Sequence, residues 1–221
     1  MENYMNDYLT IALPKGKLFT ISKNLLHRVG LSADHLSENS RKLVIENEDL
    51  KVRFIIAKTS DVPTYVEYGA ADIGIIGKDV LLESQKDVYE ILDLGFGKCH
   101  LMMAVPQKEK RRRLLDYSYT RVATKYPHIA ESFFARQGMQ MEYIKLNGSI
   151  ELGPIVGLSE SIVDIVETGT TLAENDLEEI AHILDVSARL IVNRVSFKLK
   201  FHRINEIVNN LRPIIESGEI L

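Results

Sequence analysis

The residues best placed to do chemistry in this chain form one short stretch late in the sequence. Residues 164–172 read Asp-Ile-Val-Glu-Thr-Gly-Thr-Thr-Leu, in which an apolar run passes into a polar turn. Gly169 can adopt backbone angles that a β-carbon would forbid, so successive backbone N–H groups can converge on one point. Three hydroxyl groups surround the same point, those of Thr168, Thr170 and Thr171. A turn of this kind favours an anion.

The residues on either side of the turn indicate which anion it would hold. A helix that starts at Leu172 would direct its first N–H groups and its dipole at the same point. Two acids precede the turn, Asp164 and Glu167, and a carboxylate accepts hydrogen bonds from sugar hydroxyls. The turn has no lysine and so lacks the Gly-Lys-Ser/Thr ending of a P-loop. The stretch suits a sugar phosphate, although an ordinary strand end with a capping threonine would use similar residues.

Composition limits the class of protein. The 221 residues are 45% hydrophobic and 26% charged, as in ordinary globular proteins, and the net charge of -4 argues against a nucleic-acid-binding face. Cys99 is the single cysteine, so no internal disulfide can form and a reducing compartment is expected. Residues 1–8 contain no apolar signal segment, and no run approaches the roughly 18 apolar residues of a membrane span. We therefore expect a cytoplasmic protein that binds neither nucleic acid nor membrane.

A second candidate anion site lies near the N-terminus. An apolar run over residues 9–13 is broken by a proline, and a glycine flanked by two ammonium groups follows: Lys15, Gly16 and Lys17. The spacing of apolar residues from Leu18 to Val29 predicts that a helix starts directly after this turn. A strand, a glycine turn and a helix can bind phosphate in this order. Lysine-glycine-lysine is a short pattern, however, and a solvated turn is the alternative.

Strands and helices alternate along the rest of the chain, which predicts the α/β class. Strands are expected at residues 42–46, 51–57, 71–76, 88–94, 99–105, 121–124 and 141–146, with one or two more within 177–192. Helices are expected around residues 61–68, at 127–137, from 150, and along an apolar stripe over 197–215 that Pro213 kinks or ends. The glycines around Phe96 predict a hinge between an early and a later group of motifs.

Four segments of the chain resemble the ATP phosphoribosyltransferase family. The most specific one matches the family signature without a break at Glu151, Gly157, Ser159, Ile162, Asp164-Ile165, Thr168-Gly169 and Thr171-Leu172. The other three are residues 13–18, 61–67 and 69–79, the last of which contains Asp72. The family usually has arginine in place of Lys17 and often in place of Lys58. An ammonium group does not reproduce the planar, two-pronged hydrogen bonding of a guanidinium.

The resemblance implies a reaction and a set of site residues. N1 of the ATP adenine would attack C1 of phosphoribosyl pyrophosphate and release pyrophosphate, with substrate-bound Mg²⁺ and cations neutralising the leaving group. Phosphoribosyl pyrophosphate would be bound by Glu151, Asp164, Thr168, Gly169, Thr170 and Thr171. ATP would be bound by Lys15, Gly16, Lys17, Lys58 and Asp72, and catalysis would depend on Asp164, Lys58 and Lys17. The role of Glu167 stays open.

The resemblance also implies an architecture and a partner. The family fold is similar to that of type II periplasmic binding proteins, which have two lobes and a ligand cleft between them. We expect lobe I, on the nucleotide side, at residues 1–95 and 185–221, and lobe II, which binds phosphoribosyl pyrophosphate, at residues 96–184. The chain ends soon after the C-terminal helix, so we expect the short form of the enzyme. A short form would be a homodimer alone and a hetero-octamer with a regulatory subunit similar to histidyl-tRNA synthetase.

Two other functions remain compatible with these residues. A two-lobed small-molecule-binding module would need no chemistry, and the missing signal segment counts against its secreted version. A phosphoribosyltransferase for another base usually has two adjacent acids ahead of its phosphate turn, whereas Asp164 and Glu167 are three positions apart.

Overall fold

The computed structural model describes residues 8–31, 36–37, 42–109 and 113–218. The chain divides into two compact units: unit 1 comprises Met1–Gly97 and Ser187–Leu221, and unit 2 comprises Lys98–Val186. Within the described ranges, no helix is long and apolar enough to cross a membrane. The sequence analysis found no apolar signal segment in residues 1–8. Of these, residues 1–7 lie outside the described residues.

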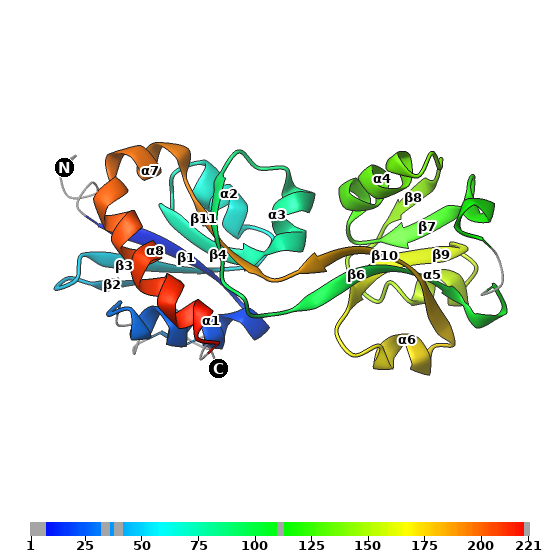
Figure 1. The fold of residues 1–221 in the computed structure, drawn as a ribbon, viewed down its shortest axis with the longest axis horizontal. Coiled ribbons are helices and arrows are strands. Elements are labelled where there is room, and N and C mark those ends of the chain that lie inside the picture. The colour runs from blue at the N-terminus through cyan, green and yellow to red at the C-terminus, as the bar shows by residue number, and fades with distance from the viewer. Residues whose placement is uncertain (1–7, 32–35, 38–41, 110–112, 219–221) are drawn as a thin grey trace. The chain divides into compact units, whose positions relative to one another are not determined.

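A six-stranded sheet forms the centre of unit 1 (Figure 1). Its order is β2-β3-β1-β4-β11-β5, in which β3, β1 and β4 are parallel while β2, β11 and β5 are antiparallel to the strands they pair with. The strands are β1 (Leu9–Pro14), β2 (Val44–Asn47), β3 (Val52–Ala57), β4 (Ile73–Gly77), β5 (Tyr89–Asp93) and β11 (Ala188–Val192). The helices are α1 (Lys17–Arg28), α2 (Val62–Glu67), α3 (Lys78–Ser84), α7 (Arg194–Leu199) and α8 (Phe201–Glu216).

Helices cover both faces of this sheet, which explains the nearly continuous apolar runs of its central strands. On one face Ile11 and its neighbours pack with apolar side chains of α1 and α8. On the other face Ala12 and its neighbours pack with α2. A β-carbon added to Gly74 would lie 2.8 Å from methyl groups of both Val62 and Val66. Glycine is therefore required where α2 approaches β4.

Asp72, which directly precedes β4, ties the C-terminal helices to the sheet. Its buried carboxylate accepts hydrogen bonds from the backbone N–H of Thr10 at 2.8 Å, from Ser196 Oγ at 2.6 Å and from Lys200 Nζ at 2.7 Å. Lys200 Nζ also donates to the carbonyl of Tyr8 at 2.6 Å. Since Lys200 is the residue between α7 and α8, this network holds the start of α8 against the amino ends of β1 and β4.

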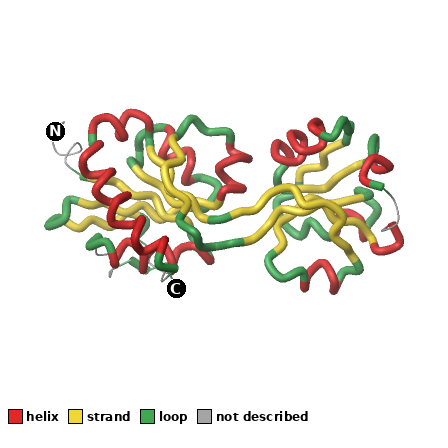
Figure 2. The backbone as a smooth tube through the Cα atoms, in the orientation of Figure 1, coloured by secondary structure: helices red, strands yellow, loops and turns green. Residues whose placement is uncertain are grey.

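A five-stranded sheet forms the centre of unit 2 (Figure 2). Its order is β10-β6-β9-β7-β8, in which β9, β7 and β8 are parallel and β6 is antiparallel to both of its neighbours. The strands are β6 (Cys99–Pro106), β7 (Arg121–Thr124), β8 (Glu142–Lys145), β9 (Ser161–Val166) and β10 (Leu177–Val186). The helices are α4 (Pro127–Arg136), α5 (Leu152–Ile155) and α6 (Thr170–Glu174), with short 3-10 segments at Gln107–Glu109 and Leu114–Tyr117.

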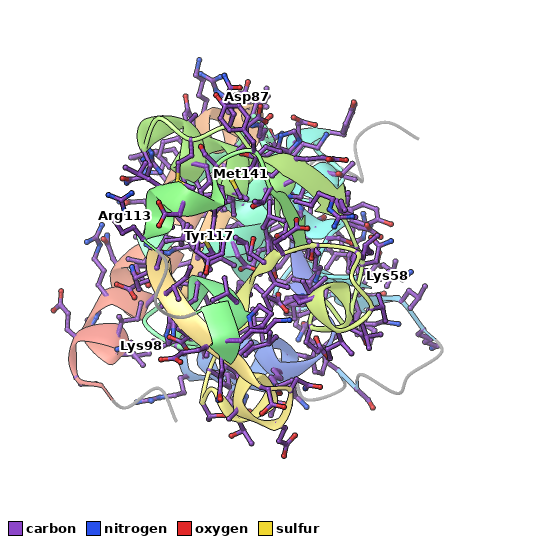
Figure 3. All side chains as sticks on the ribbon, turned by 90° about the vertical axis from the view of Figure 1, so that its right-hand side faces the viewer. Lys58, Asp87, Lys98, Arg113, Tyr117 and Met141 are labelled. Carbon is purple, nitrogen blue, oxygen red and sulfur yellow. The ribbon has the colours of Figure 1, made fainter. Side chains whose placement is uncertain are left out.

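Different helices cover the two faces of the unit 2 sheet (Figure 1). One face carries Val122 together with α4 and the fully buried Tyr117, which Figure 3 labels. The opposite face carries Ala123 and Ile162 together with Leu172 of α6. Because residues two apart in a strand share a face, the polar side chains on the side of α6 are those that alternate in register with Ala123 and Ile162.

The predicted α/β class and the predicted strands are confirmed, and three helix boundaries need correction. α6 begins at Thr170 rather than Leu172, and α5 begins two residues later than expected. The C-terminal apolar stripe is divided between α7 and α8. Pro213 lies inside α8 without ending it, because a proline removes only one ladder hydrogen bond and the following Ile214 and Ile215 still pack on the unit 1 core.

Replacement of Asp72 by asparagine should destabilise unit 1 strongly. The amide would leave the Lys200 ammonium without its counter-charge among largely buried groups, a loss that typically costs about 3–5 kcal/mol. The control is Glu46→Gln, which removes an exposed ion pair with Arg53 and should cost about 1 kcal/mol or less. Urea unfolding followed by circular dichroism measures both free energies. Similar losses for the two variants would contradict the anchoring role of Asp72.

Candidate active site

The predicted phosphate turn connects β9 to α6 in unit 2. Gly169 adopts the left-handed conformation, with φ 77° and ψ -4°, and occupies the position before the first helical residue. The hydroxyl oxygens of Thr168 and Thr170 lie 3.0 Å apart, so the two side chains face the same point. The Gly169 carbonyl accepts the hydrogen bond of Ala173 N at 3.0 Å, which closes the first helical turn. The first N–H groups of α6 have no acceptor within the helix and are available to an anion.

Asp164 lies on β9, two residues before the strand ends, on the face shared with Ile162 and Val166. Burial raises the pKa of Asp164, and the negative charge of Glu151 raises it further. The backbone N–H of Ile165 and the ammonium of Lys125 lower the same pKa. A carboxylate that has lost part of its hydration shell gains more from hydroxyl donors than an exposed one does. The position therefore suits a group that binds sugar hydroxyls.

Glu151 precedes α5 directly, and its carboxylate is close enough to Asp164 to raise the pKa of that residue. All the residues that the sequence predicts for phosphoribosyl pyrophosphate thus lie in unit 2. Sequence reasoning missed one charged neighbour, Lys125, which follows the carboxyl end of β7 beside β9. The signal was present, since a lysine directly after a buried parallel strand is a candidate ligand residue, but its relevance depends on the strand order.

The predicted ATP-binding lysines gather at one edge of the unit 1 sheet. Pro14 and Ala57 are paired in the parallel ladder of β1 and β3, so Lys15 and Lys58 follow neighbouring strand ends. Lys15 N donates to the Ala57 carbonyl at 2.9 Å, and Thr59 Oγ1 donates to the Lys15 carbonyl at 3.3 Å. These two turns lie side by side and are joined by one backbone hydrogen bond and one from the Thr59 hydroxyl.

The side chains at this edge face solvent. Lys15, Lys17 and Lys58 are exposed, and Figure 3 shows Lys58 at the surface. Within the described residues, no ion pair or hydrogen bond holds the ammonium of Lys15 or that of Lys58. Gly16, with φ 91°, sits where a side chain would be strained, directly before α1. A multiply charged phosphate group fits this concentration of positive charge.

Asp72 is the predicted ATP-binding residue whose surroundings favour another role. It precedes β4, so it lies at the opposite edge of the sheet from Lys15 and Lys58, which follow the strand ends. Both of its carboxylate oxygens already accept hydrogen bonds from inside unit 1. These contacts favour a structural function for Asp72, and its predicted contact with ATP stays a prediction.

The chain matches one protein-family model, that of ATP phosphoribosyltransferase (HisG), over residues 58–213. The ATP phosphoribosyltransferase of Desulfitobacterium hafniense (strain Y51) is 53% identical over 216 residues, which cover 95% of this chain and 97% of that protein. ATP phosphoribosyltransferase 2 of Geobacter sulfurreducens is 51% identical over 212 residues, covering 94% of this chain and 98% of that protein.

Solved structures show the same relationship. The ATP phosphoribosyl transferase (HisG:HisZ) complex from Thermotoga maritima contains a chain that is 33% identical, with a TM-score of 0.79, covering 95% of this chain and 99% of that one. The substrate-binding protein of an amino acid ABC transporter has a TM-score of 0.63 at 12% identity, covering 96% of this chain and 95% of that one, and shows the fold alone. The predicted similarity to periplasmic binding proteins is confirmed at the level of fold.

The matches to the relatives and to the solved HisG chain span nearly the whole chain, and together with the family model they favour catalysis over a binding module without chemistry. The chain therefore belongs to the ATP phosphoribosyltransferase family, whose reaction joins the phosphoribosyl group of phosphoribosyl pyrophosphate to ATP in the first step of histidine biosynthesis.

Proposed function

We propose that unit 2 binds phosphoribosyl pyrophosphate through the turn after β9. The 5-phosphate would lie against the backbone N–H groups and hydroxyls of Thr168, Gly169, Thr170 and Thr171. Asp164 would accept hydrogen bonds from the ribose hydroxyls, with Glu151 beside it. The observation that carries this proposal is the left-handed Gly169, which lies directly before α6 and three residues after the end of β9, the strand that carries the partly buried Asp164.

The lysine edge of unit 1 is the proposed binding site for the phosphates of ATP. Lys15, Gly16 and Lys17 form one turn and Lys58 begins the neighbouring one, so several donors converge on a small region. A lysine ammonium acts as a point charge, so it can bind a highly charged phosphate group without the two-pronged geometry of a guanidinium. Lys17 and Lys58 would also stabilise the negative charge of the departing pyrophosphate.

The proposed reaction depends on substrate positioning and on stabilisation of negative charge more than on proton transfer. Adenine N1 has a lone pair at neutral pH and attacks C1 of the ribose, while the bond from C1 to the pyrophosphate oxygen breaks with its electron pair going to pyrophosphate. Asp164 fixes the sugar by its hydroxyls, and the cations stabilise the growing negative charge. No side chain needs to act as a general base.

The residues near Asp164 fit a Mg²⁺ ion that arrives with the substrate. Among the described residues no group of three or more His, Cys, Asp or Glu side chains could hold a metal, so a site made by protein ligands alone is not present there. Two neighbouring carboxylates, Asp164 and Glu151, together with phosphate oxygens make the mixed ligand set that Mg²⁺ prefers. When bound, the ion supplies positive charge to the pyrophosphate.

A second subunit and a compartment complete the proposal. The solved complex from Thermotoga maritima combines HisG with HisZ, and this chain is comparable in length to its matching chain. We infer that this chain assembles with a regulatory subunit similar to histidyl-tRNA synthetase in a hetero-octamer, and forms a homodimer alone. A single cysteine and nucleotide substrates favour the cytoplasm as its location.

Asp164→Asn and Gly169→Val should each lower the rate of phosphoribosyl-ATP formation. Removing the charge from Asp164 weakens its hydrogen bonds to ribose, and valine cannot adopt the backbone angles of Gly169 without strain, so we expect losses of at least about 10-fold in kcat/KM. The measurement is absorbance of the product with Mg²⁺ and both substrates.

The matched controls are Asp185→Asn and Gly138→Val in the same unit. Asp185 is exposed, and Gly138 has φ +71° with nothing within 4 Å of an added β-carbon, so valine there adds similar strain away from the turn. Both controls should keep the activity of the parent. Unchanged activity in folded Asp164→Asn and Gly169→Val proteins would contradict the assignment of the site.

Lys58→Met should reduce turnover, whereas Lys58→Arg should retain or improve it. A neutral side chain removes one charged hydrogen-bond donor, which typically costs about 10- to 100-fold in rate, and arginine restores the charge with a two-pronged donor. Lys198→Met, at an exposed position of α7, is the control in the same unit. Steady-state kinetics of the four proteins decide the matter, and equal rates for Lys58→Met and Lys198→Met would exclude Lys58 from the site.

Histidine should inhibit the enzyme only in the presence of the regulatory subunit. The proposed assembly includes a regulatory subunit, as HisG is combined with HisZ in the Thermotoga maritima complex, so the inhibitor site is expected on that partner. Activity of the chain, alone and after mixing with a HisZ-type subunit, is measured against histidine concentration. Full inhibition of the chain alone would contradict this division of roles.

A further inference from the structure

Lys125 occupies a fixed place next to Asp164. The parallel ladder pairs Thr124 of β7 with Val163 of β9, so Lys125 and Asp164 are the next positions in the same register. Thr124 Oγ1 donates to the Val163 carbonyl at 2.7 Å and accepts from Tyr126 N at 2.9 Å. These two buried hydrogen bonds hold the backbone on both sides of Lys125 against β9.

The ammonium of Lys125 is available to a ligand. Lys125 lies just past the end of β7, two positions after Ala123, and Asp164 lies two positions after Ile162, the partner of Ala123 in the ladder. The side chain is exposed, and its Nζ lies 5.7 Å from the centre of the Tyr126 ring. In the part of the chain that the structure describes, no hydrogen bond or ion pair engages this ammonium. Its charge nevertheless acts on Asp164, whose pKa it lowers.

The phosphate turn lies on the other side of Asp164. A β-carbon added to Gly169 would lie 3.9 Å from Glu179 Oε1 of β10, and Leu172 of α6 packs in one cluster with Leu177 of β10. In the sheet order, β6 and β10 lie on one side of β9, and β7 lies on the other. Across unit 2 the order is therefore phosphate turn, Asp164, Lys125.

The substrate has groups in the same order. Around the ribose ring of phosphoribosyl pyrophosphate, the carbon that carries the 5-phosphate arm is followed by the two hydroxyl-bearing carbons and then by C1 with its pyrophosphate. If the turn holds the 5-phosphate and Asp164 holds the hydroxyls, the pyrophosphate extends toward β7. An exposed ammonium in that place meets a polyanion, which it attracts strongly.

We propose that Lys125 binds the pyrophosphate group of phosphoribosyl pyrophosphate and stabilises it as it leaves. This inference rests on the proposed function of unit 2, and it adds a catalytic residue that belongs to the same unit as Asp164. As the bond from C1 to the pyrophosphate oxygen breaks, its electron pair stays on that oxygen while adenine N1 forms the new bond to C1. Lys125 remains an ammonium throughout and donates hydrogen bonds to the growing negative charge.

The test separates the two ends of the substrate. Pyrophosphate and ribose 5-phosphate serve as inhibitors of the forward reaction and as ligands in calorimetry, against the parent, Lys125→Met and Lys125→Arg. Lys145→Met is the matched control, because Lys145 ends β8, is exposed, and pairs with Thr124 one strand further from Asp164.

Lys125→Met should weaken pyrophosphate binding and lower kcat by about 10- to 100-fold, as expected for the loss of a charged donor. Ribose 5-phosphate should bind within about twofold of the parent, because its contacts with the turn and Asp164 remain. Lys125→Arg should recover most of the activity, and Lys145→Met should behave as the parent.

Two results would overturn the proposal: unchanged pyrophosphate affinity in Lys125→Met, or equal weakening of both ligands, which would mean that Lys125 only supports Asp164. Failure of the proposed function would appear differently, as a parent protein that makes no phosphoribosyl-ATP. The calorimetric comparison of pyrophosphate binding would still decide the role of Lys125 in that case.

Discussion

The parallel pairing of strands is the constraint on which the proposed chemistry depends. In a parallel ladder all strands end at the same edge, so the residues that follow them come together however far apart they are in the sequence. In unit 1 this pairing joins the turns after β1 and β3 through the contact of Lys15 N with the Ala57 carbonyl. In unit 2 it places Lys125 next in register to Asp164. Backbone hydrogen bonds thus position the charged side chains of both units.

The electrostatics of unit 2 follow from that placement. Asp164 is partly buried, and the charges of Glu151 and Lys125 shift its pKa in opposite directions. The two carboxylates can accept hydrogen bonds and the ammonium can donate them. A sugar phosphate carries both hydroxyl donors and phosphate acceptors, so this pair of charges is compatible with the proposed binding of phosphoribosyl pyrophosphate.

Much of the fold and most of the proposed site could be predicted from the sequence, because their signals are local. Apolar runs between glycine turns predicted the strands, and the residue types of the Thr-Gly-Thr-Thr turn predicted that it binds an anion. What could not be predicted depends on distant pairing. The position of Lys125 becomes informative only once β7 is known to lie beside β9, and the structural role of Asp72 is visible only once Ser196 and Lys200 are seen to contact it. Local patterns carry no information about such long-range partners.

The path of the chain through unit 1 has a consequence for how the protein is made. β11 lies between β4 and β5 and pairs with both, yet it follows the whole of unit 2 in the sequence. On the ribosome, the segment up to Gly97 must therefore wait with its sheet interrupted between β4 and β5, while unit 2 emerges as one continuous piece. The last strand, β11, and the helices that follow it then complete the sheet, so assembly of unit 1 is tied to completion of unit 2.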